Sequence, residues 1–119
     1  MNIRALPYAL SVAKYASTPD GIEGFYSLSV TEGEISLVAE TEKLPIGFAA
    51  REDGWRALAV EGPLDFSLVG ILAKISSALA DAGIPIFAIS TFDTDYILVK
   101  ESRFTDACNA LKQKGYILI

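Results

Sequence analysis

The sequence has no histidine and a single cysteine, Cys108, among its 119 residues. One cysteine cannot form a disulfide within the chain, and the absence of histidine argues against a zinc site. The same absences exclude Ser-His and Cys-His catalytic pairs. A lone thiol is typical of a reducing compartment.

Positive charge is also scarce. Ten Lys and Arg residues stand against fifteen Asp and Glu residues, which gives a net charge of −5. The basic residues are scattered, and the densest basic group is only Lys112-Gln113-Lys114. Nucleic-acid and anionic-membrane binding both need a basic surface, so we expect neither kind of partner.

Long apolar runs are missing as well. No run approaches the ~18 residues that a membrane span needs. The N-terminal sixteen residues have some signal-peptide character, but Pro7 and Tyr8 interrupt them. A first β-strand from Ala5 to Ala13 explains this segment better. We therefore expect a cytoplasmic protein.

The composition that remains is that of a folded globular chain. Hydrophobic residues make up 51% of the sequence and charged residues 21%. The length suits one compact domain or two small halves that share a core.

The second half of the chain, residues 55–119, alternates between strand and helix patterns. The expected elements are a strand over 55–62, a helix over 64–84, strands over 84–90 and 95–101, a helix over 102–115 and a strand over 116–119. This β-α-β-β-α-β order predicts an α+β, ferredoxin-like fold, an antiparallel sheet with both helices on one face.

Glycines and polar residues mark the ends of both expected helices. Asp65 or Ser67 can cap the start of the first helix, and Gly83 can end it. Ser102 can cap the second helix, and Gly115 can end it. Its apolar face would consist of Phe104, Cys108 and Leu111.

The first half, residues 1–54, contains strand patterns but hardly any helix. A hairpin is expected around Thr31-Glu32-Gly33. Residues 14–24 and 43–54 are rich in turn residues and read as broken segments. We therefore expect a degenerate half over 1–54 and a complete domain over 55–119.

An internal repeat links the two halves. A shift of 61 positions places Leu37-Val38 on Leu98-Val99 and Glu40 on Glu101. Two unrelated hairpins could converge on one pattern, but the preserved alternation and turn length favour a shared architecture.

The segment "DFSLVG" at residues 65–70, the helix after it and "ISTFDTDYILVKE" at residues 89–101 together resemble the ACT domain. This small βαββαβ module binds amino acids and regulates metabolic enzymes. The chain is similar to the paired ACT modules of bacterial aspartate kinases and of cytosolic arginine sensors, and to small bacterial proteins with two ACT-like halves. The resemblance implies a regulatory protein without a cofactor that binds a free amino acid at a subunit or domain interface and forms a homodimer through its sheets.

The carboxylate of an amino acid needs N–H donors, which the start of a helix provides. The candidate residues at this position are Asp65, Phe66, Ser67, Leu68, Val69 and Gly70. Gly70, expected in the first turn, would let a ligand come close. Alternatively, this glycine only permits tight packing, and Ser67 is only a cap.

The ammonium group needs carboxylates or carbonyls, and Asp93 and Asp95 lie at the expected strand-strand turn. Alternatively, these aspartates only bond their own backbone. We expect this turn at the end of the sheet opposite the start of the first helix. One copy's aspartates would then not meet its own Ser67, and a second copy or the other half would complete the site. Polar interruptions also make Ile89, Ser90 and Thr91 candidates.

These patterns favour a non-catalytic amino-acid sensor, with a protein-interaction module that regulates an enzyme without a small ligand as the alternative. An acid-base pair of Glu61 and Asp65 has little support without a nucleophile or a metal. Cys108 is expected to be a small buried apolar residue and Trp55 a core or edge residue.

Overall fold

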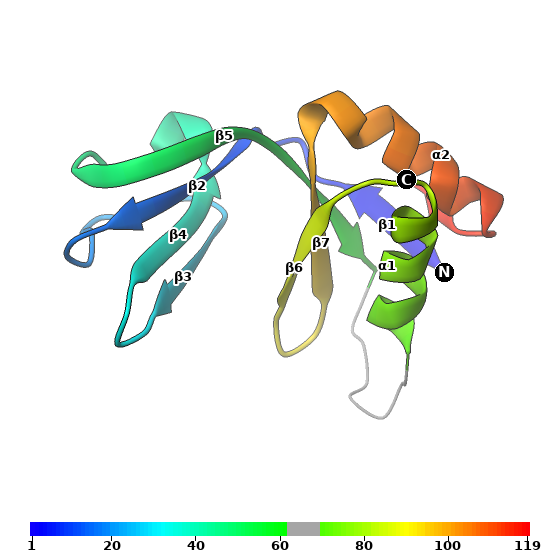
Figure 1. Ribbon diagram of the computed structural model, residues 1–119, viewed down its shortest axis with the longest axis horizontal. Helices are drawn as coiled ribbons and strands as arrows, with labels where there is room; N and C mark the ends of the chain where they lie inside the picture. Colours follow the sequence, from blue (N-terminus) through cyan, green and yellow to red (C-terminus); the bar gives the residue numbers. More distant parts are fainter. Residues whose placement is uncertain (62–69) are drawn as a thin grey trace. The chain divides into compact units, whose positions relative to one another are not determined.

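The computed structural model describes residues 1–61 and 70–119, which form two compact units (Figure 1). Residues 1–7 and 56–119 form one unit, here called the helical unit. Residues 8–55 form the other, here called the strand unit. The first seven residues thus group with the second half of the chain, and separate domains over 1–54 and 55–119 stay a prediction.

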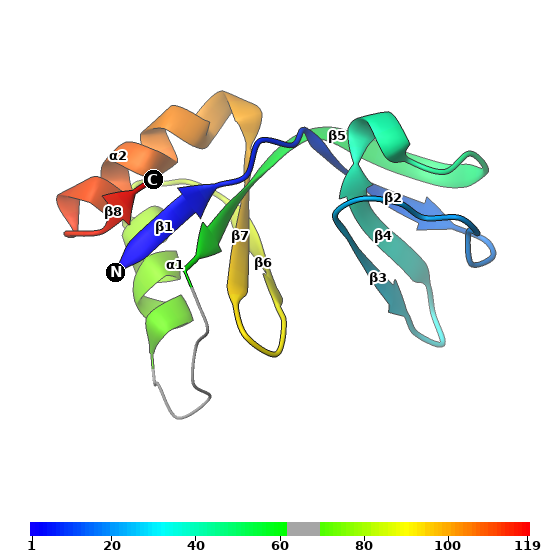
Figure 2. The ribbon, with the colours of Figure 1, turned by 180° about the vertical axis from the view of Figure 1, so that it is seen from behind.

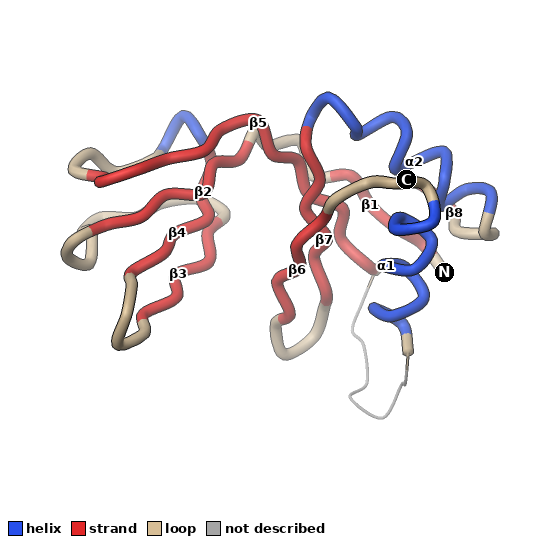
Figure 3. Tube along the Cα trace, viewed as in Figure 1, coloured by secondary structure: helices blue, strands red, loops and turns tan. Residues whose placement is uncertain are grey.

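The helical unit is an α+β sandwich of one sheet and two helices. Its elements are β1 (Asn2–Ala5), the second half of β5 (Phe48–Val60), α1 (Ile71–Asp81), β6 (Ile86–Ser90), β7 (Asp95–Lys100), the 3₁₀ turn η2 (Glu101–Arg103), α2 (Phe104–Gln113) and β8 (Ile117–Leu118). The strands lie in the order β6-β7-β5-β1-β8. Both helices lie on one face of this sheet (Figure 3). The predicted ferredoxin-like β-α-β-β-α-β fold is confirmed.

One strand of this sheet was not expected. β1 lies between β5 and β8, as the view from behind shows (Figure 2), and pairs antiparallel with β5 and parallel with β8. The predicted strand from Ala5 to Ala13 is therefore wrong. The chain forms β1 and then β2 (Leu10–Tyr15), and Pro7, which has no N–H to donate, lies in the break between them.

The core of the helical unit fills the space between the sheet and the helices. Alternate strand residues face this space, together with the apolar stripe of each helix. Its fully buried members include Ile3, Leu58, Val60, Ile75, Leu79, Ile97, Val99 and Leu111. Phe104 and Cys108 pack against it, so the predicted inward face of the second helix is confirmed.

Both helices end as predicted. At the end of α1, the N–H of Gly83 donates to Ala80 O (2.9 Å) and that of Ile84 to Leu79 O (3.0 Å). Gly115 and Tyr116 repeat this arrangement after α2. Both glycines have positive φ, 71° and 92°, which a Schellman motif requires.

The start of α2 differs from the prediction. The helix begins at Phe104 after η2, and Arg103 is its N-cap without a side-chain hydrogen bond. Ser102 therefore does not cap it. No helix within the described residues is long and apolar enough to cross a membrane.

The strand unit is an antiparallel sheet in the order β3-β4-β2-β5. Its further elements are β3 (Tyr26–Val30), β4 (Ile35–Glu40) and the 3₁₀ turn η1 (Thr41–Lys43). All residues of 8–55 are described, and no α-helix is among them. The predicted break over 43–54 is only partly correct, because β5 already begins at Phe48.

Loops complete the core of the strand unit. Its buried residues are Ala13, Tyr15, Leu37 and Ala39. Ile22 and Leu44, both outside the strands, pack against this cluster. The Tyr15 hydroxyl donates a 2.7 Å hydrogen bond to the carbonyl of Pro45, which fixes the loop after η1.

The two hairpins repeat with a shift of 60 residues, not 61. Adding 60 to the residue numbers of β3, β4 and η1 gives the bounds of β6, β7 and η2. The strands β4 and β7 also share one burial pattern. A one-residue slip exchanges the two faces of a strand. The shared architecture of the hairpins is thus present, but the predicted register is wrong.

Candidate functional site

Five of the candidate ligand residues, Asp65, Phe66, Ser67, Leu68 and Val69, lie outside the described residues. Gly70 is described, and it is the N-cap of α1 with φ 80° and ψ 7°. The predicted caps, Asp65 and Ser67, are among the residues that the structure does not describe. Gly70 also precedes the first turn, because the helix begins at Ile71.

The conformation of Gly70 accounts for the glycine. A positive φ of this size is strained for any residue with a Cβ atom. A Cβ atom added here would meet no atom of the described residues within 4 Å, so tight packing against them is not the reason. The first bond of the helix runs from the N–H of Lys74 to Gly70 O (2.9 Å). By helix geometry, the N–H groups of the three residues between them have no acceptor within α1.

The turn between β6 and β7 satisfies its own polar groups. Ser90 Oγ donates a 2.6 Å hydrogen bond to Asp95 Oδ1. Thr91 Oγ1 donates to Thr94 O (3.1 Å) and accepts from Thr94 N (3.3 Å). Ser90, Thr91 and Asp95 therefore form a hydrogen-bonded hairpin turn, while Asp93 is exposed at its tip.

This turn lies at the same end of the sheet as the end of β5. Thr94 Oγ1 donates a 2.9 Å hydrogen bond to the carbonyl of Val60, the last residue of β5. Figures 1 and 2 show the first turn of α1 at this end too. The prediction that the turn lies at the opposite end is wrong. The helical crossover returns the chain before β6 begins, so β5 and β6 both finish at one end.

Two further features of this end bear on its chemistry. Phe92, which the sequence reasoning did not consider, is 78% exposed at the tip of the turn. Glu61, once considered as half of an acid-base pair, forms an ion pair with Arg4 (3.7 Å). Within 1–61 and 70–119, no group of three or more His, Cys, Asp or Glu side chains could hold a metal ion.

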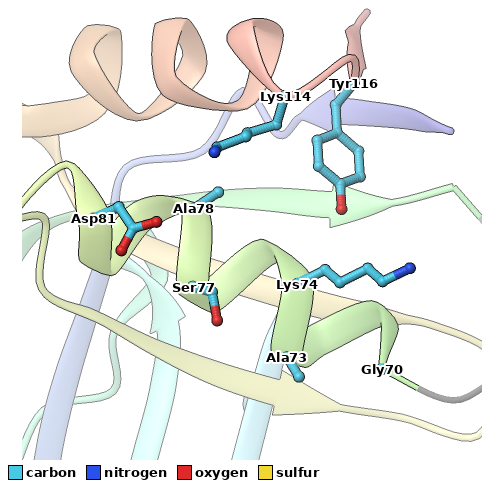
Figure 4. Close-up of a pocket in the computed structure, with 8 residues that line it drawn as sticks. All are labelled: Gly70, Ala73, Lys74, Ser77, Ala78, Asp81, Lys114 and Tyr116. Carbon is cyan, nitrogen blue, oxygen red and sulfur yellow. The ribbon is translucent and has the colours of Figure 1, made fainter.

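A groove of about 420 Å³ runs along α1 from Gly70 to Asp81 (Figure 4). Lys74 and Ser77 of α1 line it on one side, and Lys114 and Tyr116 on the other. No pattern in the sequence indicates this groove. The spacing of Lys74, Ser77 and Asp81 places them on one face of the helix, but only the fold brings Lys114 and Tyr116 beside that face.

Cys108 is not an activated thiol. It is partly buried against the core, and this burial raises its pKa, although Lys112 and Arg56 lower it by charge. A raised pKa disfavours the reactive thiolate. The cysteine therefore behaves as the small apolar residue that the sequence predicted.

Comparison with known proteins identifies the family. A family model of the ACT domain matches residues 50–113. The human protein named cytosolic arginine sensor for mTORC1 subunit 1 is 33% identical over 94% of this chain. The chain spans only 37% of the length of that relative.

Solved structures agree with this match. A protein of Agrobacterium tumefaciens is 28% identical, with a TM-score of 0.89 over 99% of this chain and 91% of the other. The regulatory subunit of aspartate kinase from Thermus thermophilus has a TM-score of 0.68 at 12% identity, over 95% of this chain and 96% of the other, and shows the shared fold alone. Because the ACT model covers more than half of the sequence, this chain belongs to the ACT domain family, whose modules include amino-acid-sensing regulatory domains.

Proposed function

We propose that this protein is a non-catalytic regulatory sensor that binds a free amino acid at one end of the helical unit. The site would lie where β5 ends, the β6–β7 turn folds and α1 begins. The observation that carries the proposal is the Thr94–Val60 hydrogen bond, which holds the turn at the end of β5. Membership of the ACT family supports the same function.

The chemistry of this end suits a zwitterion. The first N–H groups of α1, next to Gly70, are suited to a carboxylate, and the helix dipole favours negative charge there. The carboxylates of Asp93 and Asp95 are suited to the ammonium group. Because the β6–β7 turn lies at the same end of the sheet as the start of α1, one copy of the chain can supply both the N–H groups and the carboxylates.

A second copy of this chain would close the site. In this proposal the ligand lies at an interface between ACT modules, and the homodimer forms through their sheets. The residues that would contact the ligand are Asp65, Phe66, Ser67, Leu68, Val69, Gly70, Ile89, Ser90, Thr91, Asp93 and Asp95.

The acidic side chains of Asp93 and Asp95 favour a cationic amino acid. The human relative is by its name a cytosolic arginine sensor, which makes arginine the first ligand to test and is in line with a cytoplasmic location here. The proposal includes no cofactor, no nucleic acid and no membrane.

Thermal-shift screening against the twenty amino acids tests this function. A ligand of the native state raises the midpoint of unfolding with its concentration, and at 100 times its Kd it adds about 2.7 kcal/mol. Asp93→Asn should reduce the response to a cationic ligand, while Glu32→Gln, at the tip of the other hairpin, should leave it unchanged. The absence of any shift at millimolar concentrations would contradict the proposal.

A protein-interaction module is the alternative, and β8 favours it. Among the described strands, β8 is an edge strand that pairs with β1 alone, and Ile117 and Ile119 are 57% and 55% exposed. Edge strands and exposed apolar side chains are suited to pairing with another chain. Capture of one specific enzyme, equally strong with and without amino acids, would favour this function over the sensor.

A further inference from the structure

The groove along α1 has the size of a small-molecule site. Its volume of about 420 Å³ lies within the usual range of ligand pockets. It follows the side of α1, whereas the site proposed above lies at the end of the sheet, and Gly70 is the one residue that both include. The groove is therefore a different candidate site from the one at the end of the sheet.

Three charged side chains line the groove without compensating one another. Lys74, Asp81 and Lys114 form no ion pair or side-chain hydrogen bond within the part of the chain that the structure describes. The described residues that line the groove thus carry a formal charge of +1, in a protein whose net charge is −5. Free charges of both signs around one hollow suit a ligand that also carries both signs.

The charges are distributed along the length of the groove. Figure 4 shows the Lys114 side chain extending toward the end where Asp81 lies, and the Tyr116 hydroxyl pointing toward the turn of Lys74. Asp81 lies seven positions after Lys74, which is about 10 Å along the helix axis. Between these ends, Ala78 is 6% exposed and provides an apolar floor.

We propose that this groove binds an acidic amino acid. The α-ammonium group pairs with Asp81 and the α-carboxylate with Lys114. The side-chain carboxylate reaches Lys74 and the Tyr116 hydroxyl, and the methylene groups lie over Ala78. The ligand's net charge of −1 compensates the formal charge of the groove.

Other common ligands match the groove less well. A simple anion leaves Asp81 uncompensated, and a basic amino acid places its side-chain cation beside a lysine. A neutral amino acid leaves Lys74 without a partner. Charged groups that lose a hydrogen-bonding partner in a site cost binding free energy, so these mismatches discriminate.

Amide NMR titration of the whole chain tests the inference with L-glutamate as the probe. Saturable shifts are expected for Ser77, Ala78 and Tyr116. L-2-aminobutyrate lacks the side-chain carboxylate and glutarate lacks the ammonium group. Because each loses a charge-assisted hydrogen bond, each should bind at least about tenfold more weakly than glutamate.

Matched variants separate specific binding from general attraction of anions. Asp81→Asn should weaken the binding of glutamate at least about tenfold but should not weaken the binding of glutarate, because only glutamate has the ammonium group. Lys114→Gln should weaken the binding of both ligands. Lys112 is an exposed lysine outside the groove, so Lys112→Gln should weaken the binding of neither.

If Asp81→Asn lowered the affinities for glutamate and glutarate equally, or if the NMR shifts never saturated, the inference would be overturned. Shifts confined to Gly70 and Thr91 would also overturn it while supporting the sensor site at the end of the sheet. Shifts at Ser77 and Tyr116 without any at Thr91 would support the groove and leave the sensor proposal to its own test.

Discussion

The two hairpins of this protein have the same framework but different coverings. The turns at Thr31 and Thr91 share their main bonds, with Thr31 N donating to Glu34 O (2.9 Å) and Thr91 N to Thr94 O (2.8 Å). Each hairpin also continues into a 3₁₀ turn. In the helical unit α1 and α2 cover the sheet, whereas in the strand unit loops contribute Ile22 and Leu44 to the core.

This difference shows how the strand unit covers its core without an α-helix. Helices stabilise the helical unit through a large apolar contact area. The loops of the strand unit depend more on single polar contacts, such as the bond from Phe25 N to Glu40 Oε2 (2.8 Å) and that from Tyr15 to Pro45. Of the two units, only the helical unit contains α-helices, so the proposed amino-acid site belongs there.

The largest expected effect compares the two cores. Leu79 of α1 and Leu37 of β4 are both 0% exposed. We expect Leu79→Ala to cost about 3 kcal/mol of unfolding free energy and Leu37→Ala about 2 kcal/mol, because loops relax into a cavity more easily than helices do. Urea unfolding of both variants measures the difference. A larger loss for Leu37→Ala would contradict the view that loops cover their core less rigidly.

The next effect tests the polar contacts of the strand unit. Gly24 has φ 74°, and a Cβ atom there would collide with the Glu40 carboxylate. We expect Gly24→Ala to reduce the free energy of unfolding by about 2 kcal/mol, through backbone strain and loss of the hydrogen bond from Phe25 N to Glu40.

Gly21→Ala is the matched control for this substitution. Gly21 has a similar φ of 65°, but a Cβ atom there meets nothing within 4 Å. Its cost should be only about 1 kcal/mol, from backbone strain alone. Equal losses in the two variants would show that the Glu40 contact contributes nothing.

A smaller effect comes from Tyr15 and depends on pH. Burial raises the pKa of Tyr15, although the charge of Arg51 lowers it. Since the folded state holds the phenolic proton more tightly, the stabilising contribution of Tyr15 is complete below the ordinary pKa of about 10. It is lost as the pH rises from there through the higher pKa of the folded state.

Tyr15→Phe separates the two contributions of this side chain. Loss of the bond to Pro45 should cost about 1 kcal/mol at neutral pH. The variant should also lose less stability than the parent between about pH 9 and 11, because it has no phenol to ionise at that position. Unfolding curves at both pH values measure this, and identical pH slopes would contradict the burial argument.

The smallest effect tests the equivalence of the two turns. Thr31→Ala and Thr91→Ala should each cost about 0.5–1 kcal/mol, because each removes the hydroxyl hydrogen bonds to the residue three positions later in an exposed turn. Thr31 also accepts a weaker 3.3 Å bond from Gly33 N. Thr31→Ser and Thr91→Ser, which keep the hydroxyl, should cost less. A clear difference between the two alanine variants would break the comparison of the hairpins.

Much of the helical unit was predictable from local patterns. The spacing of Phe104, Cys108 and Leu111 indicated the inward face of α2, and the glycines at 83 and 115 indicated the ends of both helices, because these signals act within single elements. The insertion of β1 between β5 and β8 was not predictable in this way. It depends on pairing between the first and last residues of the chain, which no local pattern encodes.

The register of the repeat and the place of the turn failed for different reasons. Three consecutive buried residues, Leu37-Val38-Ala39 and Ile97-Leu98-Val99, hide the alternation that would distinguish a shift of 60 from 61. The β6–β7 turn was predicted at the wrong end of the sheet, although the β-α-β-β order itself places this turn at the end of β5. Of the candidate site residues, the structure joins Ser90 and Asp95 by a hydrogen bond, in the turn that Thr94 holds at the end of β5.

The sharpest test of the sensor proposal is amide NMR of the labelled protein, titrated with each of the twenty amino acids in turn. We expect at least one amino acid to produce saturable shifts at Gly70, Ile71 and Thr91, with little change in the strand unit. Shifts confined to residues 8–55, or none for any amino acid at millimolar concentration, would contradict it.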